Sequence, residues 1–297
     1  MDMDTPLHPG PVGFKVLFAA GVLTFSTLST AGFAQAQAAD TAELPIAVQM
    51  YTLRDFGSLE EQLAAVNRAG ILAIETVGTQ DVSADELNAL LEEYSLTVIS
   101  SHVPLDDLRH RLAETMAFNQ AVGNDTLTLP YLAEDARPDD AEGWQALGEE
   151  LGEIAATLDA EGFRLAYHNH AFEMEVYGDK TALEHLFDAA GSDLLAELDI
   201  AWVARGGLDP VEYIARFDDR LFAVHAKDNA PEGTAEDEGG FATLGEGVLD
   251  WDSILPAIEA AGVEWYIIEH DMPLDAEAVI TEGNRFLQEK LTALREE

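Results

Sequence analysis

The chain has 297 residues, 47% of them apolar, no cysteine and a formal net charge of −42. The 57 acidic residues face only 15 basic ones, which argues against nucleic acid as a partner, because phosphate binding needs Lys and Arg to displace counterions. Without cysteine, neither disulfides nor a lipoprotein anchor can form, so the fold depends on its apolar core. The acidic residues are spread along the chain, which is typical of adaptation to high salt.

The first 39 residues differ in composition from the rest and predict a signal peptide and leader. Lys15 precedes an apolar stretch, 16–28, and small residues follow, with cleavage expected after Ala36 or Ala38. We therefore expect a periplasmic or secreted protein with no stable membrane anchor after cleavage. The alternative, an uncleaved anchor, is disfavoured because the apolar run is shorter than the roughly 20 residues of a spanning helix.

Residues 40–297 alternate short apolar runs with longer amphipathic ones, the pattern of a parallel sheet covered by helices. We expect strands at 45–50, 71–77, 96–101, 125–130, 164–169, 195–200, 221–226 and 264–269. The length of this part is close to the roughly 250 residues of an eight-stranded α/β barrel. The sequence therefore predicts one domain, a single (β/α)8 TIM barrel.

Signals for helix starts and stops lie between these runs. Ser58 with Glu61 and Ser83 with Glu86 have the spacing of capping boxes at helix N-termini. Glycines expected to end helices are Gly70, Gly123, Gly162 and Gly262. The stretch 231–240, rich in Glu, Asp and Gly, is expected to be a long loop that could cover a ligand.

Polar residues gather where the predicted strands end, which is where barrels carry their active sites. Five of the eight histidines are there: His102, His168, His170, His225 and His270. The other polar strand-end residues are Gln49, Tyr51, Glu75, Glu173, Glu197, Asp199, Lys227 and Glu269. Since His168 and His170 are two residues apart in an extended segment, both are expected on one face.

Four neighbouring strands offer a predicted set of metal ligands: His168, Asp199, His225 and Glu269. Mixed nitrogen and oxygen donors suit a divalent ion, for which we expect Mn²⁺, with Zn²⁺, Co²⁺, Fe²⁺ or Mg²⁺ as alternatives. Four protein ligands leave positions open for substrate, which indicates catalysis. Either fifth-strand histidine alone would more often be a core residue, but the two carboxylates at equivalent places favour the metal.

The remaining strand-end residues are expected to contact substrate or to support the ligands. Glu197 shares a face with Asp199 one layer deeper, so we expect it to pair with Lys227 or to hydrogen-bond behind the metal ligands, with a direct metal-ligand role as the less favoured alternative. Lys227 is expected to place a charge near the substrate. The expected substrate contacts are Gln49, Tyr51, Glu75, His102, Glu173 and Trp202. For Tyr51 and Trp202, packing at the barrel rim is an equal alternative.

Five segments together resemble the xylose isomerase-like barrels of the sugar phosphate isomerase/epimerase superfamily, over residues 45–293. They are 46–54 (IAVQMYTLR), 167–173 (YHNHAFE), 198–202 (LDIAW), 225–228 (HAKD) and 268–270 (IEH). The resemblance implies a divalent ion held from strands five to eight by Glu, Asp, His and Glu. Asp199, His225 and Glu269 match the last three places. His168 stands where epimerases carry a glutamate that also transfers protons, so two-carboxylate epimerisation would require His168, His170 or Glu173 to supply the missing base.

The resemblance implies proton abstraction beside a metal-bound carbonyl, which the metal makes possible by stabilising the enediolate. The expected catalytic residues are His168, His170, Glu269 and Lys227. The leading interpretation is a sugar isomerase or epimerase; the alternatives are a 3-keto-glycoside lyase or hydratase and a non-catalytic exported sugar-binding protein. No glycine loop or arginine cluster for phosphate stands out, so we expect an unphosphorylated sugar or glycoside. An endonuclease of the superfamily is disfavoured by the acidic composition.

Overall fold

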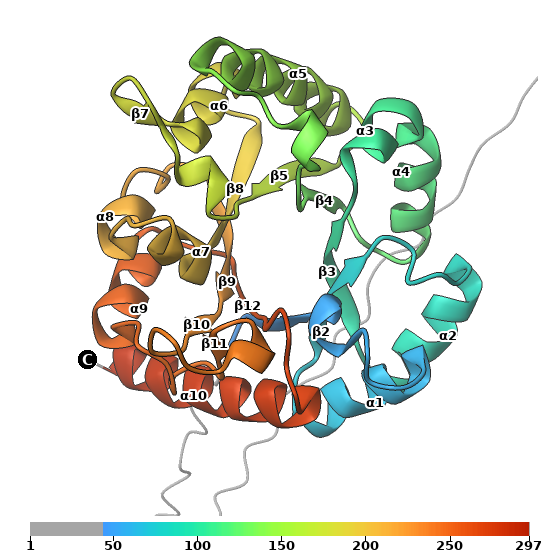
Figure 1. Cartoon of the computed structure of the whole chain (residues 1–297). Coiled ribbons are helices and arrows are strands. Elements are labelled where there is room, and N and C mark those ends of the chain that lie inside the picture. Colours follow the sequence, from blue (N-terminus) through green and yellow to red (C-terminus); the bar gives the residue numbers. More distant parts are fainter. Residues whose placement is uncertain (1–43, 297) are drawn as a thin grey trace, which may run out of the picture. The chain divides into compact units, whose positions relative to one another are not determined.

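Eight parallel strands close into a barrel in the computed structural model, which describes residues 44–296 (Figure 1). Around the barrel the order is β1-β12-β9-β8-β5-β4-β3-β2. The strands are β1 (Ile46–Gln49), β2 (Ala73–Val77), β3 (Thr97–His102), β4 (Thr126–Leu129), β5 (Arg164–His168), β8 (Leu194–Asp199), β9 (Leu221–Ala226) and β12 (Trp265–Ile268). All eight predicted strands and the predicted TIM barrel are confirmed.

Helices surround the barrel and cover the outer face of its strands (Figure 1). They are α1 (Leu59–Arg68), α2 (Ala84–Tyr94), α3 (Leu105–His110), α4 (Leu112–Ala121), α5 (Ala141–Asp159), α6 (Ala182–Ala190), α7 (Ile200–Arg205), α8 (Pro210–Ile214), α9 (Trp251–Ala260) and α10 (Ala276–Glu296). Short 3-10 helices are η1 (Met50–Leu53), η2 (Glu134–Ala136), η3 (Phe172–Met174) and η4 (Glu236–Glu238). Two small hairpins, β6 (Val176–Tyr177) with β7 (Lys180–Thr181) and β10 (Asp228–Asn229) with β11 (Phe241–Ala242), follow strands β5 and β9.

The helix boundaries follow the local signals in the sequence. Both predicted capping boxes form, Ser58 with Glu61 at α1 and Ser83 with Glu86 at α2. The four predicted helix-ending glycines adopt positive φ: Gly70 (76°), Gly123 (79°), Gly162 (79°) and Gly262 (72°). The predicted loop 231–240 runs between β10 and β11 and contains η4.

Helices α5 and α6, which precede and follow β5 in the chain, pack closely against each other. A Cβ atom on Gly148 or Gly152 of α5 would collide with the backbone oxygens of Leu186 and Ala190 of α6. Glycine therefore lets the two helix backbones touch, and this close contact fixes the outer support of β5.

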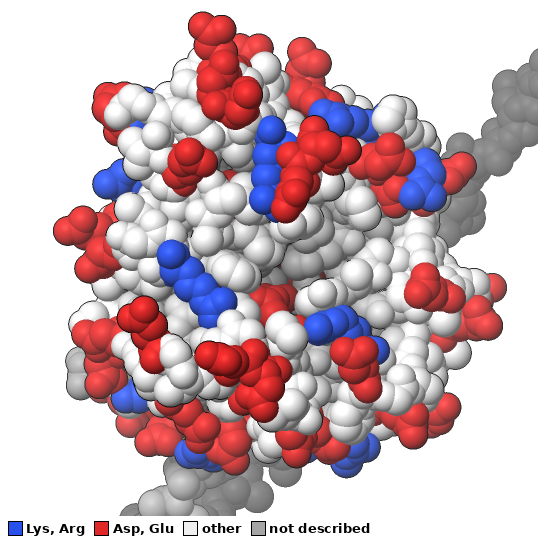
Figure 2. All heavy atoms as spheres, in the orientation of Figure 1, with Lys and Arg blue, Asp and Glu red and all other residues white. Residues whose placement is uncertain are grey.

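The predicted signal peptide, residues 1–39, lies outside the described residues. Among the helices of residues 44–296, none combines the length and the apolar character that crossing a membrane requires. The acidic residues are distributed over the molecular surface, as Figure 2 shows for one face. Near the centre of that face lies a hollow surrounded mainly by uncharged residues.

Candidate active site

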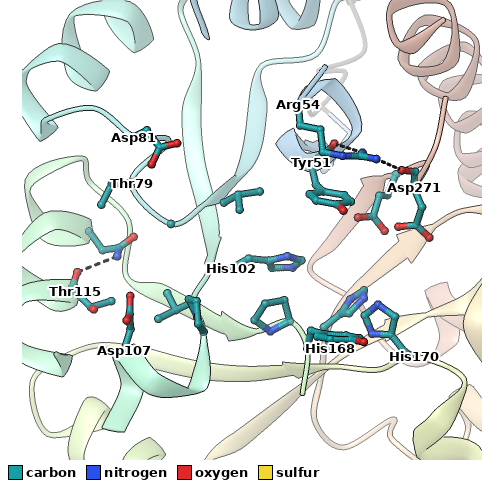
Figure 3. Close-up of a pocket in the computed structure, with 18 of the residues that line it drawn as sticks. Tyr51, Arg54, Thr79, Asp81, His102, Asp107, Thr115, His168, His170 and Asp271 are labelled. Atoms are coloured by element: carbon teal, nitrogen blue, oxygen red, sulfur yellow. Dashed lines mark hydrogen bonds between the residues drawn. The ribbon is translucent and has the colours of Figure 1, made fainter. Parts of the chain in front are cut away.

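A cavity of about 1120 Å³ opens at the carboxyl ends of the strands. Its floor is polar, with His102 from β3 and with His168 and His170 from the end of β5 (Figure 3). Glu269, directly after β12, also lines the cavity. The site therefore lies where the barrel architecture predicts chemistry.

The structure brings the four predicted metal ligands together at this floor. One donor atom from each of His168, Asp199, His225 and Glu269 lies within 4.8 Å of the others, and all four side chains are buried. His225 Nδ1 is 2.9 Å from Glu269 Oε2, a spacing that suits two ligands of one ion. Strand register explains the convergence, because Asp199 of β8 is directly paired with His225 of β9.

Two buried atoms of this group bear on whether an ion fits. His168 Nδ1 and Asp199 Oδ2 make no hydrogen bond of suitable geometry within residues 44–296. Each has a charged neighbour, because Glu197 Oε1 lies 3.2 Å from His168 Nδ1 and Lys227 Nζ lies 2.8 Å from Asp199 Oδ2. Burial and the neighbouring His225 hold the pKa of His168 well below its usual range, so its imidazole is neutral, the form that binds metal ions. Two imidazoles and two carboxylates therefore fit a divalent cation.

Lys227 lies beside this group and pairs with other carboxylates, so the alternative in which it pairs with Glu197 is wrong. Its Nζ is 2.8 Å from Asp199 Oδ2, 2.6 Å from Glu269 Oε2 and 2.9 Å from Asp271 Oδ2. Burial opposes the ammonium, but the three carboxylates outweigh burial and raise the pKa of Lys227. Lys227 is only 1% exposed, so it holds carboxylates in place rather than touching substrate directly.

Glu197 lies behind the ligands, as its second predicted role requires. Its Oε1 is 3.0 Å from His102 Nε2 and 3.1 Å from His225 Nε2, and Thr128 Oγ1 donates to its Oε2 at 3.2 Å. His102, His168, Glu197 and His225 form a second group whose donor atoms lie within 4.8 Å. The two groups share His168 and His225. They differ in that the first group adds Asp199 and Glu269, whereas the second adds His102 and Glu197.

Gln49 and Glu75, predicted to contact substrate, lie beneath the floor and are fully buried. Gln49 Nε2 donates to Glu75 Oε2 at 2.6 Å, and the same oxygen is 2.8 Å from His225 Nε2 and 3.0 Å from His102 Nε2. These contacts place both side chains below the cavity surface, where they position His102 and His225 instead of contacting substrate as predicted. Glu75 Oε1 has no hydrogen-bond partner among the described residues. Burial disfavours imidazolium, but the Glu75 and Glu197 carboxylates raise the pKa of His102 to about 9.

Glu173 is also withdrawn from the cavity, so its predicted contact with substrate is corrected. It accepts hydrogen bonds from the Tyr167 hydroxyl and from the backbone N–H of His170, each at 2.8 Å. Burial raises the pKa of Glu173 to about 8 despite these donors. The carboxyl group thus fixes the backbone that presents His170.

His170 lies on the cavity wall among aromatic rings. Its ring centroid is 5.3 Å from that of Trp202 and 5.1 Å from that of Tyr131. Its Nδ1 is buried and, within the described part of the chain, lacks a hydrogen-bond partner. Burial and the Lys227 charge lower the pKa of His170 to about 3, so the ring is neutral.

Tyr51 and Trp202 both line the cavity, as a role in binding substrate requires. Tyr51 is 41% exposed and its ring lies under the Arg54 guanidinium at 3.9 Å. Trp202 packs edge-on against Phe241 at 5.3 Å. Tyr51 and Trp202 thus both pack against neighbouring side chains and line the cavity, so the two predicted roles are compatible.

The sequence reasoning missed Asp271, Arg54 and Arg205, which line the cavity. Asp271 follows His270 directly, so its place after the eighth strand was a usable signal. Arg54 Nη2 donates to the Asp271 backbone oxygen at 2.6 Å. Arg205 Nη2 donates to Gly239 O at 3.0 Å, which places the predicted long loop beside the cavity; no local sequence signal indicates this contact.

Comparisons with known proteins agree with this geometry. A family model described as xylose isomerase-like TIM barrel matches residues 63–290. The rhizopine catabolism protein MocC of Rhizobium meliloti is 29% identical over 141 residues, 43% of each chain. An inosose dehydratase of Geobacillus kaustophilus is 29% identical over 140 residues, 42% of this chain and 45% of that protein. The chain therefore matches less than half the length of these curated relatives.

Solved structures share the fold over most of the chain. A sugar phosphate isomerase/epimerase from Parabacteroides distasonis has a TM-score of 0.70 at 17% identity, covering 84% of this chain and 95% of that one. An IOLI protein solved with a bound zinc atom has a TM-score of 0.65 at 17% identity, covering 82% and 97%. At such identities the similarity concerns the fold.

Proposed function

Because the chain belongs to the xylose isomerase-like TIM barrel family, we propose that it is a divalent-metal-dependent enzyme acting on an unphosphorylated sugar. It removes a proton from the carbon beside a carbonyl, as an isomerase or epimerase does. The observation that carries this proposal is the buried group at the cavity floor, where one donor atom from each of His168, Asp199, His225 and Glu269 lies within 4.8 Å of the others. Named relatives that act on sugar-like compounds support it.

His168, Asp199, His225 and Glu269 would hold the ion, with Mn²⁺ as the first candidate and Zn²⁺ as the metal seen in the IOLI structure. When bound, the ion supplies Lewis acidity that polarises the sugar carbonyl. All four side chains are buried, although His168 and Glu269 also line the cavity. Lys227 keeps the carboxylates of Asp199 and Glu269 at fixed positions.

Proton transfer falls to groups that reach the cavity surface. Glu269 and His170 both line it, from β12 and from the end of β5. His170 Nδ1 has no hydrogen-bond partner among the described residues, so the neutral ring would hydrogen-bond a substrate hydroxyl or carbonyl. Glu173 fixes the backbone of His170 and Trp202 packs beside its ring, which holds the imidazole in one orientation for the reaction.

A dehydratase or lyase is the second candidate. The β5 place holds His168 rather than a carboxylate, so the two-glutamate pair of an epimerase is incomplete. An imidazole suits protonation of a departing oxygen, and two of the named relatives support elimination: an inosose dehydratase and a probable 3-DHS dehydratase from Bacillus anthracis. The sugar would then lose a β-oxygen substituent after the same proton abstraction.

Isotope exchange separates these reactions. Purified protein with Mn²⁺ is incubated in D₂O with free ketoses and with 3-keto-glucosides. Deuterium beside the carbonyl without release of the aglycone supports an isomerase or epimerase, whereas aglycone release supports a lyase. Asp199→Asn and Glu269→Gln should lose both metal and exchange, and His110→Asn, at an exposed histidine on α3, is the control. Sugar binding that needs no metal, with no exchange, would instead support a binding protein.

We also propose that the enzyme is exported, on the strength of the apolar stretch 16–28 and the small residues that follow it. Mass spectrometry of the protein recovered from cell fractions tests this. A mature N-terminus near residue 37 or 39 outside the cytoplasm supports export, and an intact Met1 in the cytoplasm contradicts it.

A further inference from the structure

The cavity extends well beyond the metal-ligand group. From the floor it continues past His102 toward the loop after β2 and the helices α3 and α4, where Figure 3 shows Thr79, Asp81, Asp107 and Thr115 on the side opposite His168 and His170. We call this part the outer arm. It is lined by Val77, Gly78, Thr79, Asp81, Val103, Pro104, Asp107, Arg111, Glu114, Thr115, Phe118 and Asn119.

The size of the cavity exceeds what one sugar needs. Its volume of about 1120 Å³ is above the roughly 300–1,000 Å³ of pockets that enclose drug-sized ligands. A single sugar ring is much smaller than such a ligand. A ring over the floor residues therefore leaves the outer arm available to a second part of the same substrate.

Part of the lining of the outer arm is apolar. Val77 is 40% exposed although it is a large aliphatic residue at the end of a barrel strand. Phe118 of α4 is partly buried against the core and also lines the cavity. Apolar walls of this kind suit the faces of a ring, whose C–H surface leaves water on binding.

The polar groups of the outer arm select a neutral ligand. Thr79 and Thr115 supply hydroxyls, and Asp81, Asp107 and Glu114 supply carboxylates. Arg111 is the arm's cation, and its guanidinium is bonded to Asp107, four residues earlier. Carboxylates accept hydrogen bonds from hydroxyl groups and repel phosphate or another carboxylate.

Local backbone geometry builds this wall. Gly78, Gln80 and Asp81 all have positive φ, of 55°, 56° and 59°, a conformation uncommon for residues other than glycine. Between α3 and α4, Arg111 interrupts the helix with φ −131° and ψ 22°, which sets the direction of α4 and of Phe118. The arm is thus a formed part of the fold.

We propose that the substrate is a neutral glycoside whose second ring fills the outer arm while its reacting sugar lies over the metal-ligand floor. This inference rests on the proposed function for the reacting end alone. The outer arm would favour binding of a glycoside over a free sugar. Its carboxylates would repel the phosphate group of a sugar phosphate that entered the arm.

Calorimetric titration tests the arm without requiring turnover. Mn²⁺-loaded protein is titrated with glucose, galactose and xylose, with their phenyl glycosides and disaccharides, and with glucose 6-phosphate. We expect at least one glycoside to bind about tenfold tighter than its parent sugar, and the phosphate to bind no tighter than glucose. Val77→Glu and Phe118→Ala should remove the glycoside's advantage. Val248→Glu, at a similarly exposed valine outside the cavity lining, should retain it.

Two results would overturn the inference: no glycoside binds tighter than its parent, or the advantage survives both Val77→Glu and Phe118→Ala. Val77 is exposed, so its variant should fold, and a melting curve verifies this for each protein. Isotope exchange in the same samples keeps the proposals apart. A glycoside preference without exchange or release contradicts the proposed function alone, and exchange of free ketoses without a preference contradicts the outer arm alone.

Discussion

The Nζ of Lys227 lies 2.6 Å from Oε2 of Glu269, so a buried ammonium touches one of the four proposed metal ligands. The same ammonium is 2.8 Å from Asp199, a second ligand. The floor thus holds the Lys227 ammonium beside the proposed metal site, and both cations would contact the carboxylates of Asp199 and Glu269. Lys227 neutralises part of the acidic group at all times, which allows so many carboxylates to be buried together.

Removing that ammonium should make folding depend strongly on metal. Lys227→Met leaves Asp199, Glu269 and Asp271 without their common cation, and breaking a buried ion pair in this way costs about 3–5 kcal/mol. Mn²⁺ should offset part of the loss, because it binds the same carboxylates. Thermal unfolding with EDTA and with Mn²⁺ measures both effects. Lys290→Met, at a surface pair with Asp252, is the control; an equal loss in both variants would contradict the assignment.

The two candidate ligand groups make opposite predictions for Asp199 and Glu197. If Asp199 is a ligand, Asp199→Asn should abolish tight Mn²⁺ binding. Glu197→Gln should weaken it only by about 10–100-fold, as for residues that orient ligands. Equilibrium dialysis followed by metal analysis measures both affinities. Retention by Asp199→Asn together with loss in Glu197→Gln would move the ion to the group containing His102.

Glu173 should make the protein less stable as the pH rises. Burial raises its pKa from the usual 4.5 to about 8 in the folded state, so the folded protein retains a proton that the unfolded chain releases. Between pH 4.5 and 8 this carboxyl therefore lowers the free energy of unfolding, by at most about 1.4 kcal/mol for each pH unit. Below pH 4.5 the effect is absent, and above pH 8 it is constant.

Glu173→Gln should remove this dependence, because the amide cannot ionise. The variant should gain stability relative to the parent between pH 5 and pH 8, measured by urea unfolding at each pH. Glu175→Gln, two residues later and exposed, should follow the parent. A parent and a Glu173→Gln variant with parallel pH profiles would show that the carboxyl titrates alike in both states.

Much of the site followed from the sequence because strand ends converge in a closed barrel. Alternating apolar and amphipathic runs predicted the strands, and the positions of Asp199, His225 and Glu269 in them predicted the convergence. Depth was harder to predict. Glu197 and Asp199 share a face, but two residues along a strand displace a side chain by about 6–7 Å, and the sequence does not state which layer opens to the cavity.

The same problem of depth explains the errors at Gln49 and Glu75. These residues are directly paired between β1 and β2, which places them in one layer of the barrel interior, below the cavity floor. Glu173 was misplaced for another reason: η3 turns the chain after β5 and directs its carboxyl group back to His170 N–H. Such contacts arise from loop geometry, which periodicity in the sequence does not specify.

Arg54 should affect substrate binding through two neighbours rather than through the metal. Its guanidinium donates to the backbone oxygens of Tyr51, at 2.8 Å, and of Asp271, at 2.6 Å, and covers the Tyr51 ring. Arg54→Met loosens both cavity residues, so KM should rise several-fold, on the order of 1 kcal/mol for a lost hydrogen bond, with bound Mn²⁺ unchanged. Arg68→Met, which breaks a surface pair with Glu277, should leave KM unaltered. Loss of metal in Arg54→Met, or an unchanged KM, would contradict this role.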